Sequence, residues 1–273
     1  MPTRDTPIAP FARAIFWFVA VNALIGAGSL ILFPSQTDTF FFWQITPPIN
    51  AALFGALYLG GAVTVAWVAY RGIWEQARFL VPILVAAGFF ISLTTFIHLD
   101  RFITGIKLVY WLIVYIGAPL LALFIYVYQE RRGGNWDVQE PVLPVTRRLA
   151  IITGAVVSIF GLALLIAPQT VIDFWPWNAS PLMIRIFASW FIAFGVGLLW
   201  FYFDHDWSRL RLISYLMMAA AGLDLLMIFL FRADWKAANL NVVIYCLHLL
   251  AFGLVGFFMQ WLQRKARHTA PVP

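Results

Sequence analysis

Charged residues are scarce in this chain of 273 residues. Only 11% of the residues are Asp, Glu, Lys or Arg, and 63% are hydrophobic, whereas soluble proteins carry about 25% charged residues. Several uncharged stretches reach the roughly 20 residues that a helix needs to cross about 30 Å of hydrocarbon. The strand-like alternation of outer-membrane barrels is missing. The sequence therefore predicts an all-α integral membrane protein.

Cysteine and the common catalytic motifs are also lacking. The only cysteine, Cys246, lies in an apolar stretch, so an intramolecular disulfide or a metal site with several cysteines cannot form. The chain has no Gly-rich phosphate loop ending in Lys-Ser/Thr, no HExxH, no GxSxG and no paired CxxC. We therefore expect no catalytic residues and no bound metal, and a non-enzymatic role is favoured.

Basic residues are few, but they are distributed unevenly. They lie in short connections between apolar stretches rather than on a soluble basic domain, so the net charge of +6 does not predict nucleic acid as a partner. Thirteen of the 18 Lys and Arg fall on the side that carries both termini. The remaining five are Arg101, Lys107, Arg185, Arg232 and Lys236. The positive-inside rule then predicts a protein of the cell membrane with both termini in the cytoplasm.

One stretch occurs twice, at 34–61 and again at 168–195. The two copies share a constant offset of 134 residues. Five identities hold this register: Pro34 with Pro168, Phe40 with Phe174, Trp43 with Trp177, Pro47 with Pro181, and Gly61 with Gly195. Ordered identities at one offset indicate an internal duplication.

The duplication predicts the architecture. We expect two tandem four-helix repeats, 1–133 and 134–273, joined by a polar linker at about 129–147 that contains a Gly pair and two prolines. Because four crossings return the chain to its starting side, the repeats are parallel and related by a pseudo-twofold axis along the membrane normal. The eight expected spans are 11–33, 47–70, 79–99, 103–128, 149–167, 181–203, 212–231 and 240–262.

The repeated motif falls on the outer face in this topology. Its tryptophans, Trp43 and Trp177, suit the lipid headgroup region, and Pro47 and Pro181 suit the first turn of a helix. We interpret the four residues as interface anchors and helix starts. The alternative is an aromatic-lined outer pocket about the pseudo-twofold axis.

Three ionisable residues lie inside the spans of the second repeat. Asp224, Arg185 and His248 fall at similar depths, roughly 7 to 13 Å from the outer face by helical rise. Ionised side chains at membrane depth are costly and face protein or a water-filled cavity. The sequence therefore predicts one buried polar cluster, with Arg185 able to pair with Asp224. The cluster is either a ligand or ion site or a structural lock between helices.

A second polar set lies at the outer ends of spans three and four. It comprises His98, Asp100, Arg101 and Lys107, for which we expect mainly structural or topological roles. His98 and His248 are also the candidate axial ligands if the chain binds haem or a pigment. Their different depths disfavour joint ligation, and no cofactor is the main expectation.

Two classes of function fit these features. The first is a non-enzymatic bundle that binds or passes a small or lipophilic molecule or an ion through an outward-facing cavity between the repeats. The second is a scaffold or accessory subunit whose apolar faces pack against other membrane subunits as well as the lipid bilayer. An enzyme acting on lipid is a third class, disfavoured because no nucleophile and base pair is recognisable.

Overall fold

The computed structural model of the protein describes residues 5–236 and 240–269. Within these ranges the chain is helical and contains no strand. It has eight helices that are long and apolar enough to cross a membrane, which confirms the predicted multi-pass membrane class. The spans are Pro10–Leu32 (α1), Pro48–Arg71 (α3), Trp74–Ile97 (α4 and α5), Ile106–Arg131 (α6 and α7), Pro144–Ile166 (α8), Pro181–Tyr202 (α10 with a 3-10 turn), Trp207–Leu230 (α11) and Leu240–Arg267 (most of α12, Leu240–Thr269).

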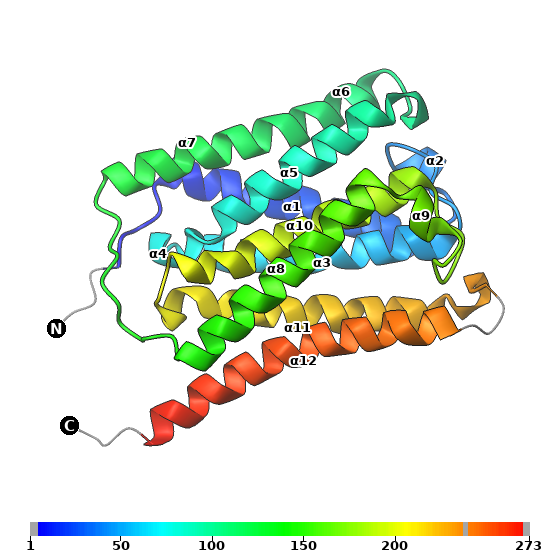
Figure 1. The fold of residues 1–273 in the computed structure, drawn as a ribbon. Helices are drawn as coiled ribbons and strands as arrows, with labels where there is room; N and C mark the ends of the chain where they lie inside the picture. Colours follow the sequence, from blue (N-terminus) through cyan, green and yellow to red (C-terminus); the bar gives the residue numbers. More distant parts are fainter. Residues whose placement is uncertain (1–4, 237–239, 270–273) are drawn as a thin grey trace.

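Four helices form the centre of the bundle. α3 packs against α1 and α11, and α10 packs against α8 and α5, so the inner helices of the two halves of the chain contact one another (Figure 1). In the most apolar stretch of α3 and α10, 67% and 72% of the residues are buried, against 22% in α1 and α12. The outer helices α1, α7, α8 and α12 therefore present apolar side chains to the surroundings.

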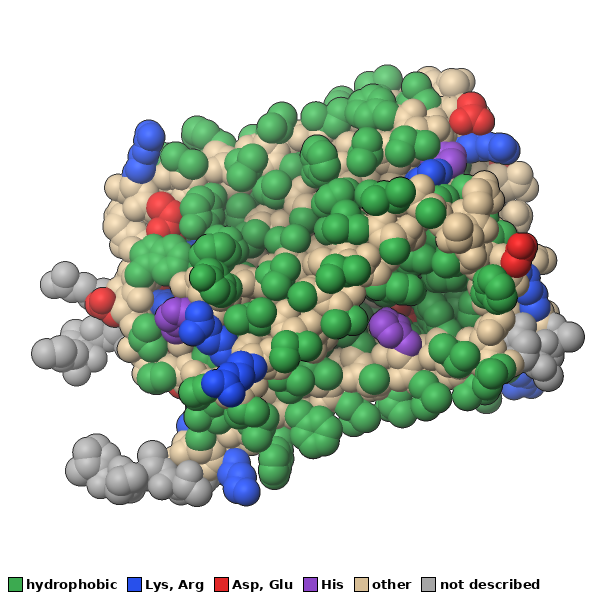
Figure 2. Space-filling view, viewed as in Figure 1, with side chains coloured by type: hydrophobic (Ala, Val, Ile, Leu, Met, Phe, Trp, Pro, Cys, Tyr) green, Lys and Arg blue, Asp and Glu red, His purple; other side chains and the backbone are tan. Residues whose placement is uncertain are grey.

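The surface agrees with this arrangement. Hydrophobic side chains cover most of the face seen in Figure 2, and charged side chains gather toward the two ends of the helices. Charges at both ends with an apolar band between them are typical of a membrane-spanning bundle. The connection between α7 and α8 lies at one end, where α1 begins and α12 ends (Figure 1). We call it the linker end.

Small residues set the distance between α8 and α10. A Cβ added at Gly154 would lie 2.9 Å from the carbonyl oxygen of Gly195. A Cβ at Gly195 would lie 2.0 Å from the Ser158 Oγ. Membrane helices gain no hydrophobic driving force from each other, so close backbone packing through small residues is a main source of their association.

An arginine near the start of each half fixes the end of a neighbouring helix. Arg13 donates from Nε to the Ala69 carbonyl oxygen at 2.7 Å, at the C-terminal end of α3. Arg147 donates from Nε to the Phe201 carbonyl oxygen at 3.1 Å, next to the end of α10. The last carbonyl groups of a helix lack partners and carry partial negative charge, so a guanidinium stabilises them.

Candidate functional site

Two cavities stand out among the membrane-spanning helices. The first cavity has a volume of about 170 Å³ and lies among α1, α3, α5, α6 and α7, closed by Trp190 of α10 and Leu216 of α11. It lies inside the first half rather than between the halves, where the sequence prediction put it. The reason is that the inner helices of the two halves pack directly against one another. The space left over is within each half.

The lining of the first cavity is aliphatic and aromatic with few polar groups. Phe18, Ile91 and Trp111 are representative members. Its polar groups are paired: the Tyr110 hydroxyl donates to Asn22 Oδ1, and the hydroxyls of Tyr58 and Tyr115 bond each other. The lining therefore suits an apolar molecule, with hydroxyl groups available to a single polar substituent.

A π-helical turn brings Tyr115 to this lining. The segment Ile113–Gly117 joins α6 (Ile106–Leu112) to α7 (Ala118–Arg131). Ser92 Oγ on α5 donates to the Tyr115 carbonyl oxygen at 3.1 Å. The neighbouring Gly88 leaves room for Pro119, since a Cβ there would lie 2.0 Å from the Pro119 Cγ. π-turns inside helices occur frequently at functional sites.

The first cavity borders the outer surface between α1 and α6. Phe18 and Tyr110 line it while being 57% and 41% exposed. α1 packs mainly against α3, and α7 packs mainly against α5. The hydrogen bond from Tyr110 to Asn22 therefore bridges two helices that are otherwise held by different neighbours. A ligand would enter here from the lipid side.

The second cavity lies in the second half and is much smaller, about 20 Å³. It is lined by residues of α8, α10, α11 and α12, with Leu57 of α3. Asp224, Tyr245 and His248 are its polar members. Asp224 is 5% exposed, and its Oδ1 atom has no hydrogen-bond partner among the residues that the structure describes.

Arg185 does not join Asp224. Its Nε donates to the Leu165 carbonyl oxygen at 2.9 Å, at the end of α8, and its Nη1 lies 2.8 Å from His98 Nε2. Because a guanidinium only donates, His98 Nε2 is the acceptor and the imidazole is neutral. The expected Arg185–Asp224 pair is wrong, since the close packing of α5 on α10 brings the end of α5 to Arg185 instead.

The predicted cluster is thus divided. Asp224 and His248 line one cavity together, while Arg185 links α10 to His98 at the end of α5. His98 lies just beyond the α5 span, and its pKa is lowered by burial and by the adjacent Arg185 charge. The nitrogen that a haem iron would need on His98 is the one that faces Arg185.

The other members of the outer polar set lie apart from both cavities. Asp100 and Arg101 form an ion pair at 3.1 Å, with both side chains 71% exposed. Lys107 donates from Nζ to the carbonyl oxygens of Asp38, Thr39 and Phe41 at 2.8 to 3.0 Å. It therefore caps the short helix α2 (Thr37–Phe40). The four residues are not gathered into one site.

The tryptophans of the repeated motif are buried, so their predicted position in the lipid headgroup region is wrong. Trp43 is 1% exposed and Trp177 is 0% exposed. Trp177 Nε1 donates to Asn50 Oδ1 at 2.8 Å, and Asn50 Nδ2 donates to the Asn178 carbonyl oxygen at 2.9 Å. The connections fold back over the helix ends, which covers both indoles. Pro47 immediately precedes α3, and Pro181 begins α10, as predicted.

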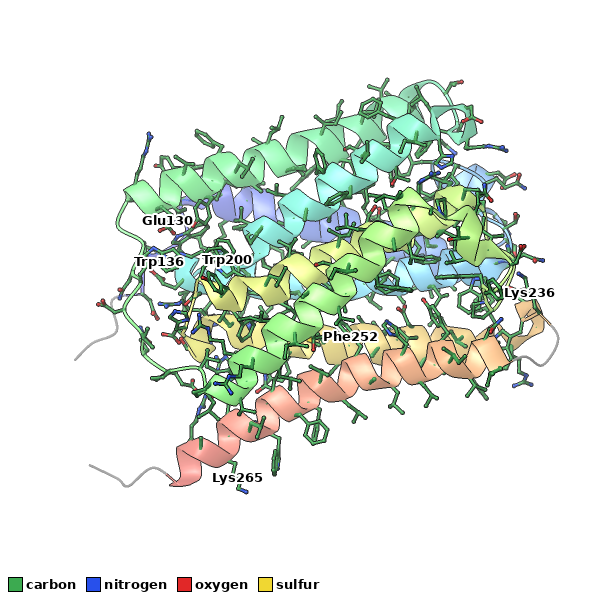
Figure 3. All side chains as sticks on the ribbon, viewed as in Figure 1. Glu130, Trp136, Trp200, Lys236, Phe252 and Lys265 are labelled. Carbon is green, nitrogen blue, oxygen red and sulfur yellow. The ribbon has the colours of Figure 1, made fainter. Side chains whose placement is uncertain are left out.

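A buried ionic network at the linker end was not foreseen from the sequence. Arg78, 0% exposed, pairs with Glu130 at 2.7 Å and stacks on Trp136 at 3.8 Å. Arg209 pairs with Asp204 at 2.7 Å. Figure 3 labels Glu130 and Trp136 at this end, opposite Lys236.

Both arginines of this network hold the linker. Arg78 Nη1 donates to the Asn135 carbonyl oxygen at 3.1 Å, and Arg209 Nη1 donates to the Asp137 carbonyl oxygen at 3.0 Å. The linker therefore packs between charged groups from both halves and is part of the folded core. Its acidic and aromatic residues were the available signal, but a polar segment with glycines resembles a solvated loop in sequence.

Comparisons with protein family models, with curated proteins and with solved structures find no match to this chain. The residues and cavities described above are therefore the basis for any functional conclusion.

Proposed function

We propose that this chain is a non-enzymatic multi-pass membrane protein that binds a lipophilic small molecule in the first cavity. The observation that carries the proposal is the cavity itself, about 170 Å³ with an almost wholly apolar lining. Well-packed membrane interiors leave few voids larger than a water molecule, since each void forfeits dispersion contacts. A void of this size and lining is accounted for by an apolar occupant.

The size and chemistry of the cavity define the ligand class. An engineered apolar cavity of about 150 Å³ is known to bind benzene or xenon, so the first cavity matches one ring or a short branched chain. The hydroxyls of Tyr58 and Tyr115 provide one hydrogen-bonding position inside it. We infer a lipophilic molecule that inserts one ring or chain segment, with at most one carbonyl or hydroxyl group on the inserted part.

Entry from the lipid is part of the proposal. The border of the cavity between α1 and α6 is spanned by Tyr110 and Asn22. Breaking this one hydrogen bond and turning the Tyr110 side chain outward would widen the border without unpacking a helix pair. A lipophilic ligand would then reach the cavity without passing through water.

The proposed architecture is two parallel copies of one four-helix unit. Equivalent backbone hydrogen bonds at offsets of 133 and 134 residues support it. These pairs are Ile8 N to Gly72 O with Val142 N to His205 O, Trp74 N to Thr6 O with Trp207 N to Glu140 O, and Ile103 N to Phe42 O with Lys236 N to Pro176 O. Contacts repeated at one offset favour a duplicated unit entering the membrane twice in the same direction.

We propose that the linker end faces the cytoplasm. It carries both ends of the helical bundle (Figure 1) and basic residues such as Arg13, Arg131 and Arg147, whereas the opposite end has the fewer Lys and Arg. The positive-inside rule favours this orientation in the cell membrane. Cysteines introduced singly at Arg131 and Asp100 and labelled with an impermeant maleimide would test it, with only the Asp100 position labelled from outside.

Filling the first cavity tests the function. Ala87 lines it on α5, so Ala87→Phe should occupy the space with a ring. Val109→Phe is the matched control, because Val109 is 51% exposed on the neighbouring α6. With benzene as the probe, wild-type protein and the control should gain thermal stability in detergent as ligand binding predicts. Ala87→Phe should gain none.

Native mass spectrometry of the purified protein adds the natural ligand. Lipophilic molecules that travel with wild-type protein should be missing from Ala87→Phe and present in Val109→Phe. Equal benzene stabilisation of all three proteins would contradict binding in this cavity. It would leave a scaffold role, with apolar faces packing on other membrane subunits, as the better account.

A further inference from the structure

The second cavity gathers polar groups that have no partner. Asp224, Tyr245 and His248 all line it, and none of their side-chain polar atoms makes a hydrogen bond within residues 5–236 and 240–269. The Asp224 carboxyl is 95% buried, since only 5% of the residue is exposed. Buried polar groups in folded proteins are satisfied almost without exception, by protein, water or a bound ion. The three groups therefore point to an occupant of the cavity.

The charge of Asp224 determines the sign of that occupant. An ionised carboxyl at membrane depth is costly unless it has a partner. Arg185, the nearest expected counter-ion in the sequence, is engaged with Leu165 and His98. In the described part of the chain no ion pair includes Asp224. A positively charged occupant would supply the missing partner.

The lining and the size narrow its chemistry. The cavity of about 20 Å³ exceeds the roughly 10–15 Å³ needed for one water molecule but leaves no room for a second. Phe187, Trp190 and Phe191 contribute aromatic faces, which attract ammonium groups. A hard metal cation instead needs six or more oxygen ligands, and the lining offers only one carboxyl and one phenol.

We propose that the second cavity binds a water-sized cation bearing N–H groups, namely an ammonium ion or the head of a primary alkylammonium. The Asp224 carboxyl is its counter-ion. The imidazole of His248 and the hydroxyl of Tyr245 accept further N–H groups. The faces of Trp190 and Phe191 complete the enclosure.

The position of the cavity favours access from the lipid side. His248 is half-buried on α12, with its ring 5.9 Å from that of Phe160 on α8 and 6.1 Å from that of Phe191 on α10. In Figure 2 a hollow opens in the apolar face beside a histidine side chain, where Figure 1 shows α8 and α12. An alkyl tail on the ammonium group would leave through this hollow into the bilayer.

Methylammonium chloride is the probe that tests this inference. It stays protonated at neutral pH, like the lysine amine with its ordinary pKa of about 10.4. Calorimetric titration of the full chain in mild detergent at constant ionic strength should show saturable binding. Tetramethylammonium, which has no N–H group and is too large, and sodium chloride should each compete at least tenfold less well.

Two variants separate the roles of charge and space. Asp224→Asn keeps the shape and removes the charge, and it should weaken methylammonium binding at least tenfold. Val157→Ile adds one methylene group to a cavity that holds one water, and it should weaken binding to a similar degree while the carboxyl remains. Asp100→Asn makes the same chemical change at an exposed carboxyl, so it should bind as wild type does.

Wild-type protein that does not bind methylammonium would overturn the inference, because the cavity then holds only water. It is equally overturned if Asp224→Asn and Val157→Ile bind as wild type, or if sodium competes as well as methylammonium does. Should Asp224→Asn elute as aggregate, Val157→Ile decides the question alone. This test concerns the second cavity, so its outcome is independent of benzene binding in the first.

Discussion

The two cavities occupy corresponding places in the two halves of the chain but differ in size and polarity. The first is about 170 Å³ and apolar, and the second is about 20 Å³ with an unpartnered carboxyl. The lining pairs related by offsets of 133 or 134 residues are Ile91 and Asp224, Tyr115 and His248, Ala23 and Val157, and Gly88 and Ala221. Larger side chains reduced the second cavity while ionisable ones changed its chemistry. One helical frame can thus support two kinds of site.

The linker end offers a related contrast, because the two buried ion pairs differ in exposure. Arg209→Met is expected to have the largest effect on stability. It leaves Asp204 and Asp206, whose side chains are 1% and 0% exposed, without a counter-charge. Breaking a buried pair in this way costs about 3–5 kcal/mol of unfolding free energy. Unfolding in mixed micelles with increasing SDS measures it.

Arg78→Met is the comparison for that measurement. Its partner Glu130 is 21% exposed and keeps two indole donors, Trp74 and Trp136, so the loss should be smaller. Equal losses for the two variants would show that exposure of the carboxylate partner does not set the cost.

Ile91→Asp places the residue of the second cavity into the first. Ile91 is 1% exposed and lies among apolar side chains, so the new carboxyl has no partner. We expect a loss of about 2.5–3.5 kcal/mol in unfolding free energy, measured in the same mixed micelles. Ile91→Leu keeps the volume and should stay close to wild type. An Asp variant as stable as the Leu variant would mean that the first cavity is hydrated.

The reverse exchange, Asp224→Ile, should stabilise the protein. It removes a buried carboxyl that lacks a hydrogen bond, which is worth about 1–3 kcal/mol. Thermal unfolding without added ammonium ions is the appropriate measurement, because a bound cation would stabilise only the wild type. A fall in stability under that condition would mean that the Asp224 carboxyl has a stabilising partner in the folded protein.

The smallest expected effect is a pH dependence at His98. Its pKa lies below the ordinary value of 6.5 because of burial first and the Arg185 charge second. A lowered pKa in the folded state means that this contribution is fully present above pH 6.5 and is lost as the pH falls through the folded value. The bond from Arg185 to a half-buried acceptor is worth about 1 kcal/mol.

Thermal unfolding between pH 7.5 and 5 measures this dependence. His98→Gln retains an acceptor that does not titrate, so it should remove the His98 contribution to the pH dependence. If the wild type and His98→Gln lose stability in parallel over this range, the Arg185–His98 contact does not bear on stability.

The sequence predicted the helical framework well and the side-chain partners poorly. Eight spans were expected and eight are present, because apolar length alone identifies a membrane helix. Arg185 was matched to Asp224 by depth, yet depth says nothing about which face of a helix a residue occupies. The packing of α5 on α10 selected His98 instead.

Two further features lay beyond sequence reasoning. The register of the duplication matches Arg78 with Arg211, but the buried ion pair of the second half uses Arg209. The first cavity arises from the absence of side-chain volume between α1 and α6, and a single sequence does not show missing volume. Trp43 and Trp177 were misplaced because connections that fold back over helix ends cannot be distinguished from exposed loops by composition.

The central claim is that the two cavities bind different ligands independently, and one crossed binding measurement tests it. Calorimetric titrations of benzene and of methylammonium would be run on wild-type protein, Ala87→Phe and Asp224→Asn in the same detergent. We predict that Ala87→Phe loses only benzene binding and that Asp224→Asn loses only methylammonium binding. A variant that loses both ligands, or neither variant losing its own, would contradict the account.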